Sequence, residues 1–339
     1  MHPAPSAPPF AVLLEKISSA WESLSIAAIA RLGVADCLES GPKTTARIAA
    51  ELNLHEDSLY RVLRALAGSG IFFEGDGRTF SQTPLSALLC TNARPSLRYC
   101  AMMSLDDWYH KGFQAVAETI ANGRTGMHNV FGMEMFGYLQ KNPAEAENFN
   151  KGMTDLSSGE APAVVASYDF SGFSHIVDVG GGMGLLLAAV LESAPGLRGT
   201  LFDMPYVIEQ ARSAPTLAPH AGRCDFVGGD FLEGVPAGAD AYIMKHIIHD
   251  WDHERSAKML GNCRRSMKPG GKLLVVDRVI GAPNEPDAKK YFDIAMMVWP
   301  GGRERDHAEW RALFHASGFR LERVIPTPGP HSILEGAPV

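Results

Sequence analysis

The chain of 339 residues has little cysteine and no C-x-x-C pair among its five cysteines. Their odd number and scattered positions argue against a disulfide framework or a cysteine metal site, so we expect reduced thiols and no bound metal. No apolar run reaches the length of a membrane-spanning helix. The first ten residues also lack the basic and apolar blocks of a secretory signal, so we expect a cytoplasmic protein.

An excess of basic residues is also missing, because the formal net charge is −7. Nucleic acids and anionic membranes are normally met by a basic face, and this balance argues against both as partners. The remaining composition, 46% hydrophobic and 20% charged, is ordinary for a globular protein. The length allows two domains with proper cores.

The N-terminal part has the pattern of a winged helix. An apolar helical pattern from Phe10 to Leu38 precedes a helix–turn–helix over residues 44–53 and 55–66, and residues 70–82 indicate a two-stranded wing. Residues 1–105 hold nine Lys and Arg against nine Asp and Glu, so the charge pattern of a DNA reader is absent. The pattern favours a scaffold reused for subunit pairing. A ligand-sensing DNA-binding regulator is the non-enzymatic alternative.

Residues 90–172 are predicted to be mostly helical and are rich in methionine and aromatic side chains, including Met103, Phe149 and Met153. Such polarizable, adaptable side chains suit a pocket for flat ring ligands. The alternative is that they are the packed core of the helices.

After Ser174 the pattern alternates between strand and helix. Strands are predicted over residues 175–180, 199–203, 225–229, 240–245, 272–279, 319–327 and 332–335, with helices at 252–267 and about 306–317. Such alternation is typical of a doubly wound α/β domain, whose sheet here has seven mostly parallel strands. We expect three parts: residues 1–100, a helical linker over 101–172, and a ligand-binding domain over 173–339.

The most informative segment joins the first of these strands to a helix. It has glycine at four of the five positions 180–184, which is typical of a turn that cradles a nucleotide, although an ordinary strand-to-helix turn is the alternative. Asp203 ends the next strand, where a carboxylate can accept hydrogen bonds from both ribose hydroxyls. A dinucleotide is disfavoured because leucine replaces the third small residue of its fingerprint at 185 or 187. The acidic Asp178 suits a cationic ligand, and S-adenosylmethionine fits that description.

Other chemistry-bearing residues also follow strand ends, where ligands bind in such sheets. Asp230 and Phe231 can hold and cover an adenine, or form a simple turn with a packed ring. His249 is a candidate general base, because an imidazole titrates near working pH. Asp277 and Glu304 are the candidate carboxylates that would orient it. A metal site on His246, His249 and His253 would need a continuous helix, which this stretch does not favour.

Five motifs in order resemble one enzyme family over almost the whole chain. Asp-Val-Gly-Gly-Gly-x-Gly, Asp-Met-Pro, Gly-Asp-Phe, Lys-x-x-x-His-Asp-Trp-Asp and Gly-Gly-Arg-Glu-Arg are similar to the small-molecule O-methyltransferases of the caffeic-acid and hydroxyindole type and their bacterial natural-product relatives. The resemblance implies a class I methyltransferase domain, a winged-helix dimerisation domain and a homodimer. It implies that His249 is the base, flanked by Asp277 and Glu304. It implies cofactor contacts at Gly180, Gly182, Asp203, Asp230, Phe231 and Lys245, and acceptor contacts at Phe149 and Met153. We add Asp178 to the cofactor contacts because of its charge, and Met103 to the acceptor contacts because it lies in the methionine-rich segment.

Three positions depart from the plant members of that family. Asp277 stands where they usually have Glu, His246 where they often have Trp, and Trp299 where they have a polar pocket residue. We therefore expect His246 and Trp299 to contact an acceptor other than a plain phenylpropanoid, such as a polycyclic flat aromatic of bacterial secondary metabolism.

The expected reaction is methylation of a phenolic or enolic hydroxyl, with transfer of its proton to His249. A non-methylating reaction on a polyketide, such as hydroxylation coupled to decarboxylation, is the enzymatic alternative, because some relatives catalyse it with the same cofactor.

Overall fold

The computed structural model describes residues 8–339. The prediction that the first ten residues carry no secretory signal therefore concerns mainly residues outside the described part. The described chain divides into two compact units. The first comprises the residues up to His110 together with Asn142–Leu156, and the second comprises Lys111–Lys141 and Ser157–Val339. The segment 101–172 is thus shared between the units, and the boundaries at residues 100 and 172 stay predictions.

The first unit contains the predicted winged helix. A long helix, α1 (Pro9–Arg31), leads to α2 (Val34–Cys37), and the helix pair is α3 (Thr45–Leu52) and α4 (Glu56–Gly68). The Thr44 side chain caps α3 by accepting a hydrogen bond from the Arg47 backbone N–H. The wing, β2 (Phe72–Gly75) and β3 (Thr79–Gln82), gains a short third strand, β1 (Lys43–Thr44), which the sequence analysis did not predict.

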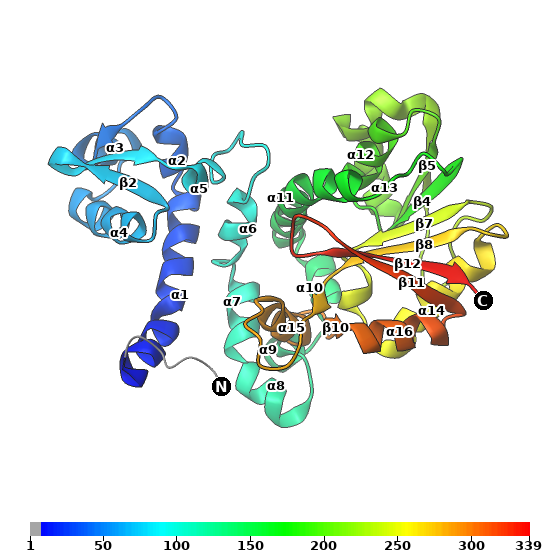
Figure 1. The fold of residues 1–339 in the computed structure, drawn as a ribbon. Helices are drawn as coiled ribbons and strands as arrows, with labels where there is room; N and C mark the ends of the chain where they lie inside the picture. Colours follow the sequence, from blue (N-terminus) through cyan, green and yellow to red (C-terminus); the bar gives the residue numbers. More distant parts are fainter. Residues whose placement is uncertain (1–7) are drawn as a thin grey trace. The chain divides into compact units, whose positions relative to one another are not determined.

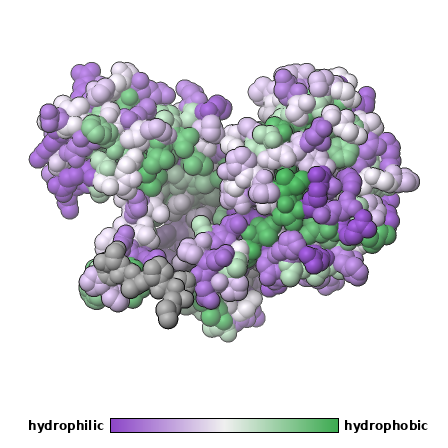
Figure 2. All heavy atoms as spheres, in the orientation of Figure 1, coloured by the Kyte–Doolittle hydropathy of each residue, from purple (hydrophilic) through white to green (hydrophobic). Residues whose placement is uncertain are grey.

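Helix α1 presents an apolar side to solvent. Phe10 and Trp21 are 80% and 70% exposed, and Leu13, Leu14 and Ile17 are also exposed. The view in Figure 2 shows hydrophobic residues among polar ones at the surface of this unit. Exposed apolar area of this kind is a mark of a protein–protein contact.

The predicted helical segment after the wing is confirmed as helical. Its helices are α5 (Pro84–Ala87), α6 (Arg98–Met103), α7 (Asp107–Gln114), α8 (Val116–Asn122), α9 (Gly126–Phe131), α10 (Met135–Lys141) and α11 (Pro143–Ser167). None of the helices in the described part of the chain is long and apolar enough to cross a membrane. All five cysteines are free, as predicted.

The second unit is built on a seven-stranded sheet in the order β11-β12-β8-β7-β4-β5-β6. The strands are β4 (His175–Val179), β5 (Arg198–Asp203), β6 (Cys224–Gly228), β7 (Ala241–Lys245), β8 (Lys272–Asp277), β11 (Phe319–Pro326) and β12 (Ser332–Pro338). Strands β4 to β8 run parallel, whereas β12 pairs antiparallel with β8 and β11 with β12. The predicted fold class is confirmed.

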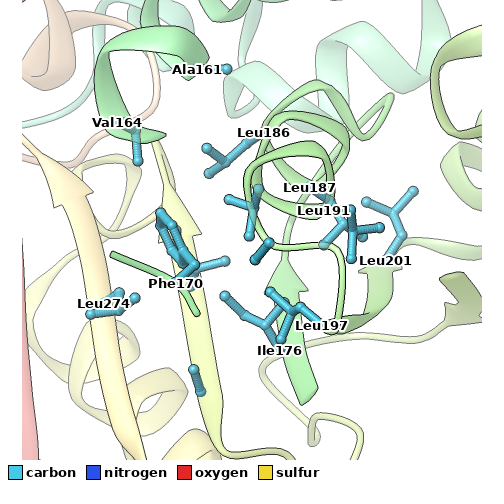
Figure 3. Packing of buried hydrophobic residues seen from close by; sticks show 14 of the residues in the cluster. Ala161, Val164, Phe170, Ile176, Leu186, Leu187, Leu191, Leu197, Leu201 and Leu274 are labelled. Carbon is cyan, nitrogen blue, oxygen red and sulfur yellow. The ribbon is translucent and has the colours of Figure 1, made fainter. Parts of the chain in front are cut away.

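Helices cover both faces of this sheet, with α12 (Leu185–Ser193) and α13 (Pro205–Ser213) on one and α14 (His253–Ser266) and α16 (His307–Ala316) on the other (Figure 1). Successive side chains of each strand point to opposite faces of the sheet, so the strands contribute to a hydrophobic core on each face. Ile176 packs under α12, and its neighbour Val177 packs on the α14 side. Figure 3 shows the first core, where Leu186, Leu187 and Leu191 of α12 lie over Ile176 and Leu201. This packing fixes the strand ends that carry the polar residues.

Besides α8, α9, α10 and the end of α11, this unit contains short strands, turns of 3-10 helix and one further helix. They are η2 (Pro215–Arg223), η3 (Ile248–Asp250), β9 (Val279–Ile280), α15 (Lys289–Val298) and β10 (Arg305–Asp306).

Candidate active site

The glycine segment forms a tight loop between β4 and α12. Gly180 and Gly182 have φ angles of 71° and 56°, in the left-handed region that favours glycine. A Cβ at Gly181 would lie 2.7 Å from the Asp178 carboxyl group. A side chain at Gly181 is thus excluded, and the N–H groups of Gly180 and Gly181 donate to the Phe202 carbonyl oxygen, which ties the loop to β5.

Two aspartates flank this loop. Asp203 ends β5 and accepts hydrogen bonds from the backbone N–H groups of Gly182, at 2.8 Å, and Met204, at 2.7 Å. Asp178 is buried, and its Oδ2 has no hydrogen-bond partner among the described residues. Burial raises the pKa of Asp178 to about 7 and also raises the pKa of Asp203. Buried carboxyls with raised pKa values, one of which has an oxygen without a hydrogen-bond partner, fit a ligand that brings positive charge and hydrogen-bond donors.

The predicted adenine-binding pair follows β6. Asp230 accepts a hydrogen bond from the Leu232 backbone N–H at 2.8 Å, and the Phe231 ring lies edge-on to Trp251 with centroids 5.9 Å apart. The Asn262 side chain holds the Phe231 carbonyl oxygen at 2.6 Å. These contacts hold the turn in place. A fixed turn is compatible with both alternatives for this pair, adenine binding and a simple turn with a packed ring.

Lys245, at the end of β7, is 7% exposed and donates to Ser157 Oγ at 2.8 Å and Glu160 Oε2 at 3.1 Å. Its ammonium group is thus held by α11. Glu160 was not among the predicted site residues, because an isolated acid within a helical segment carries no local signal.

His249 lies in η3, directly after β7, and is 3% exposed. Its Nδ1 is 2.8 Å from Asp277 Oδ1 and 2.9 Å from Glu304 Oε1, and its Nε2 is 3.6 Å from Asp250 Oδ1. The three predicted catalytic residues thus come together. An Nδ1–H that donates to a carboxylate fixes the tautomer in which the lone pair of the neutral ring is on Nε2.

The carboxylates dominate the electrostatics of this group. Burial disfavours the imidazolium, but the charges of Asp277, Glu304 and Asp250 outweigh it and hold the pKa of His249 well above its usual range. Burial likewise opposes ionisation of Asp277, yet His249 keeps that pKa well below its usual range. Burial and the neighbouring Asp277 raise the pKa of Glu304, and burial raises the pKa of Asp250 to about 7. His249 is therefore a strong base inside a cluster with excess negative charge.

The segment that contains Glu304 is fitted directly against the backbone of His249. The Arg303 backbone N–H donates to the His249 carbonyl oxygen at 2.8 Å, and a Cβ at Gly302 would overlap that same oxygen. The buried Arg305 guanidinium donates to the carbonyl oxygens of Ile248, at 3.2 Å, and Trp251, at 3.1 Å. The Gly-Gly-Arg-Glu-Arg motif thus orders the loop of the candidate base. Gly302 and Arg305 were not among the predicted site residues, although both stand within that motif.

The predicted acceptor contacts are divided between the units. Met103, Phe149 and Met153 belong to the first unit, where the Phe149 ring lies 6.2 Å from the ring of Trp108. His246 and Trp299 belong to the second. The His246 ring is 5.1 Å from the His249 ring, and the Trp299 ring is 5.6 Å from that of Phe113. Only His246 is thereby placed beside the candidate base.

Three groups of metal-type donors occur among the described residues. They are Glu160, His246 and His331; His246, His249 and Asp277; and Asp36, Glu39 and Cys90. The set of His246, His249 and His253, which the sequence pattern does not favour, is not among them. Lys245 already donates to Glu160, and its ammonium charge would repel a cation there.

A glycine cradle, an acid at the end of the next strand and a mostly parallel seven-stranded sheet with helices on both faces define the class: this is an S-adenosylmethionine-dependent methyltransferase of the class I fold. Residues 113–320 match the family model of the O-methyltransferase domain, and residues 14–92 match that of the O-methyltransferase dimerisation domain. The chain belongs to this O-methyltransferase family.

Relatives extend over nearly the whole chain. A phenazine O-methyltransferase of Lysobacter antibioticus is 40% identical, with 99% of this chain and 98% of the relative covered. The solved structure of a methyltransferase in calicheamicin biosynthesis, in its SAH-bound form, is 35% identical with a TM-score of 0.88 over 97% of each chain. A phenazine-1-carboxylate N-methyltransferase of Pseudomonas aeruginosa is 31% identical over 93% of each chain. The reaction class of the chain is therefore methyl transfer of the natural-product type.

Proposed function

We propose that this protein methylates a phenolic or enolic hydroxyl of a flat aromatic natural product, with His249 as general base. The observation that carries the proposal is the pairing of buried His249 Nδ1 with Asp277 and Glu304, which leaves Nε2 as the basic nitrogen. The acceptor class is supported by the phenazine relatives, whose names indicate flat tricyclic substrates.

S-adenosylmethionine, when bound, supplies a methyl group made electrophilic by the positive sulfonium. The residues that fit its parts are Asp203 for the ribose hydroxyls, Asp230 and Phe231 for the adenine, and Asp178, Gly180, Gly182 and Lys245 around the glycine loop. The unpartnered Asp178 Oδ2 supports this fit, because it needs a donor or a positive charge.

His249 acts on the acceptor. A phenol has a pKa near ~10 and is a poor nucleophile while protonated, so a base that removes its proton during attack helps. Nε2 takes that proton, and Asp277 and Glu304 stabilise the imidazolium that forms. We expect general-base help of about 10²–10⁴-fold, with the larger share from holding the acceptor oxygen in line with the methyl carbon.

N-methylation is the second candidate, because one relative is named as an N-methyltransferase. A ring nitrogen that attacks through its lone pair has no proton to lose and needs no base. The two carboxylates paired with His249 Nδ1, those of Asp277 and Glu304, therefore favour the hydroxyl acceptor. The non-methylating reaction on a polyketide stays an alternative, and the DNA-binding regulator is disfavoured because α4 begins with Glu56 and Asp57.

The test compares His249→Gln with His253→Gln, which changes an exposed histidine four residues away. Turnover of hydroxylated naphthalenes and phenazines is followed by mass gain of one methyl, and cofactor affinity is followed by calorimetry. We expect His249→Gln to lose about 10²–10⁴-fold in kcat and to retain cofactor affinity, while the control matches the wild type. Unchanged kcat on an unactivated phenol would remove His249 from the mechanism.

We also propose a homodimer formed through the dimerisation domain. The exposed apolar side of α1 supports this, because it would otherwise remain in contact with water.

A further inference from the structure

A second polar cluster lies beside the candidate base. Glu160 of α11 is its centre, with Lys245 Nζ at 3.1 Å, His246 Nε2 at 2.8 Å and His331 Nδ1 at 3.5 Å from its carboxylate oxygens. The rings of His331 and His246 have centroids 4.5 Å apart, and those of His246 and His249 5.1 Å. Three imidazoles thus form a row that ends at His249.

The charges in this cluster are already balanced. The Glu160 carboxylate can only accept hydrogen bonds, so the ring nitrogens that face it are the protonated ones. Lys245 supplies the positive charge that pairs with it. Burial and the Lys245 charge hold the pKa of His246 well below its usual range, and burial lowers the pKa of His331 to about 4. Both rings are therefore neutral, and the second nitrogen of each is a hydrogen-bond acceptor.

These second nitrogens have no partners in the described part of the chain. His331 Nε2 is fully buried and makes no hydrogen bond. His246 Nδ1 is likewise without one, and the His246 backbone is held at a φ of 58°, a left-handed conformation uncommon for a non-glycine residue. An unsatisfied buried acceptor and a strained backbone are both more common at binding sites than elsewhere.

We propose that His246 and His331 recognise a hydrogen-bond donor of the acceptor substrate, an O–H or N–H group on a ring position near the methylated hydroxyl. The inference rests on the proposed function and narrows its substrate to dihydroxy or amino-hydroxy aromatics. A donor-bearing ring satisfies the open nitrogens, whereas a ring without a donor leaves both unpaired and that of His331 buried as well. A metal ion is the less favourable occupant, because Lys245 already holds Glu160.

The experiment uses matched naphthalenes: 2,3-dihydroxynaphthalene and 3-amino-2-naphthol, which carry the donor, against 2-naphthol and 3-methyl-2-naphthol, which do not. We expect kcat/KM in the wild type to be roughly 10- to 100-fold higher for the first pair. We expect His246→Phe and His331→Phe each to lower this ratio of kcat/KM values towards the ratio set by the intrinsic reactivity of the acceptors. This holds even where the absolute rate also changes. His253→Phe is the matched control and keeps the wild-type ratio.

His246→Asn supplies a rescue, because asparagine tolerates the left-handed backbone and its amide oxygen accepts a hydrogen bond. We expect it to retain more of the ratio than His246→Phe. Calorimetric affinity for S-adenosylmethionine shows that each variant is folded.

The outcomes separate the two proposals. Methylation of all four naphthalenes without a donor preference overturns the inference and leaves the proposed function standing. No methylated product from any acceptor overturns the proposed function, and the inference with it. A preference that disappears in EDTA overturns the inference in favour of a metal ion on Glu160, His246 and His331.

Discussion

The substitution Asp277→Asn isolates the effect of one carboxylate on the candidate base. His249 must be neutral to accept a proton, so kcat/KM rises with pH through the pKa of His249. Asp277 holds that pKa high, and an asparagine of the same shape keeps an oxygen near Nδ1 without the charge. The variant therefore lowers the pKa of His249, and its activity begins to rise at a lower pH than that of the wild type.

The magnitude follows from the geometry. Charges about 4 Å apart interact by about 4 kcal/mol at an effective dielectric of about 20, which corresponds to about 3 pKa units. Glu304 Oε1 remains 2.9 Å from Nδ1 and replaces part of that stabilisation. We expect an acid shift of about 1–3 units. Glu304→Gln should shift the profile less, because Arg278 lies 3.4 Å from Glu304 Oε1 and already offsets part of its charge.

The assay is kcat/KM from about pH 5 to about pH 10 with 2-naphthol, with product measured by mass. A second phenol of lower pKa is the control. If the rise of kcat/KM with pH reflects ionisation of the acceptor, its midpoint shifts when the acceptor is changed and does not shift when Asp277 is substituted. The plateau of Asp277→Asn should also be lower, since a weaker base helps less. A rise of kcat/KM whose midpoint is unchanged in Asp277→Asn, or lies at higher pH, would refute the role assigned to Asp277.

Two further outcomes are expected. Asp203→Asn weakens S-adenosylmethionine binding by about 10- to 100-fold in a calorimetric titration, because a charged acceptor for two ribose hydroxyls is lost; unchanged affinity would contradict the ribose role. Trp21→Glu, which puts a charge on the exposed side of α1, converts the dimer to monomer in light scattering, whereas Tyr291→Glu, at an exposed aromatic on α15, does not; a wild-type protein that is already monomeric would contradict the proposed dimer.

The strands and the residues at their ends could be predicted because the signals are local. Apolar runs such as Leu273–Val276 are long enough to be buried strands, and the carboxyl ends of parallel strands must meet at one edge. Once His249 and Asp277 are placed at the ends of the neighbouring strands β7 and β8, their proximity follows from the topology. The winged helix was predictable for the same reason, since its turn and cap residues act within a few positions.

The second cluster could not be predicted, because its members come from separate parts of the chain. Glu160 lies on α11, His246 after β7, and His331 just before β12, the strand that enters the sheet antiparallel beside β8. A single acid in a helix and a single histidine in a turn have no pattern of spacing. The contact of Gly302 with the His249 carbonyl is of the same kind, because only the folded chain brings the two segments together.

The excess of buried acid at this edge of the sheet accounts for the choice of cofactor. Burial raises the pKa values of Asp178 and Asp250 to about 7, and also raises those of Asp203 and Glu304, so four carboxyls resist ionisation. The two nearby cations offset only part of these acids: Arg278 lies 3.4 Å from Glu304, and Lys245, whose charge opposes the rise in the pKa of Asp178, is also paired with Glu160. A pyrophosphate would add negative charge to this edge, whereas the ammonium and sulfonium of S-adenosylmethionine remove the imbalance. In the proposed function Asp178 and Asp203 serve the cationic cofactor, whereas Asp277 and Glu304 stabilise the imidazolium of His249, so cofactor binding and proton transfer use different acids at the ends of neighbouring strands.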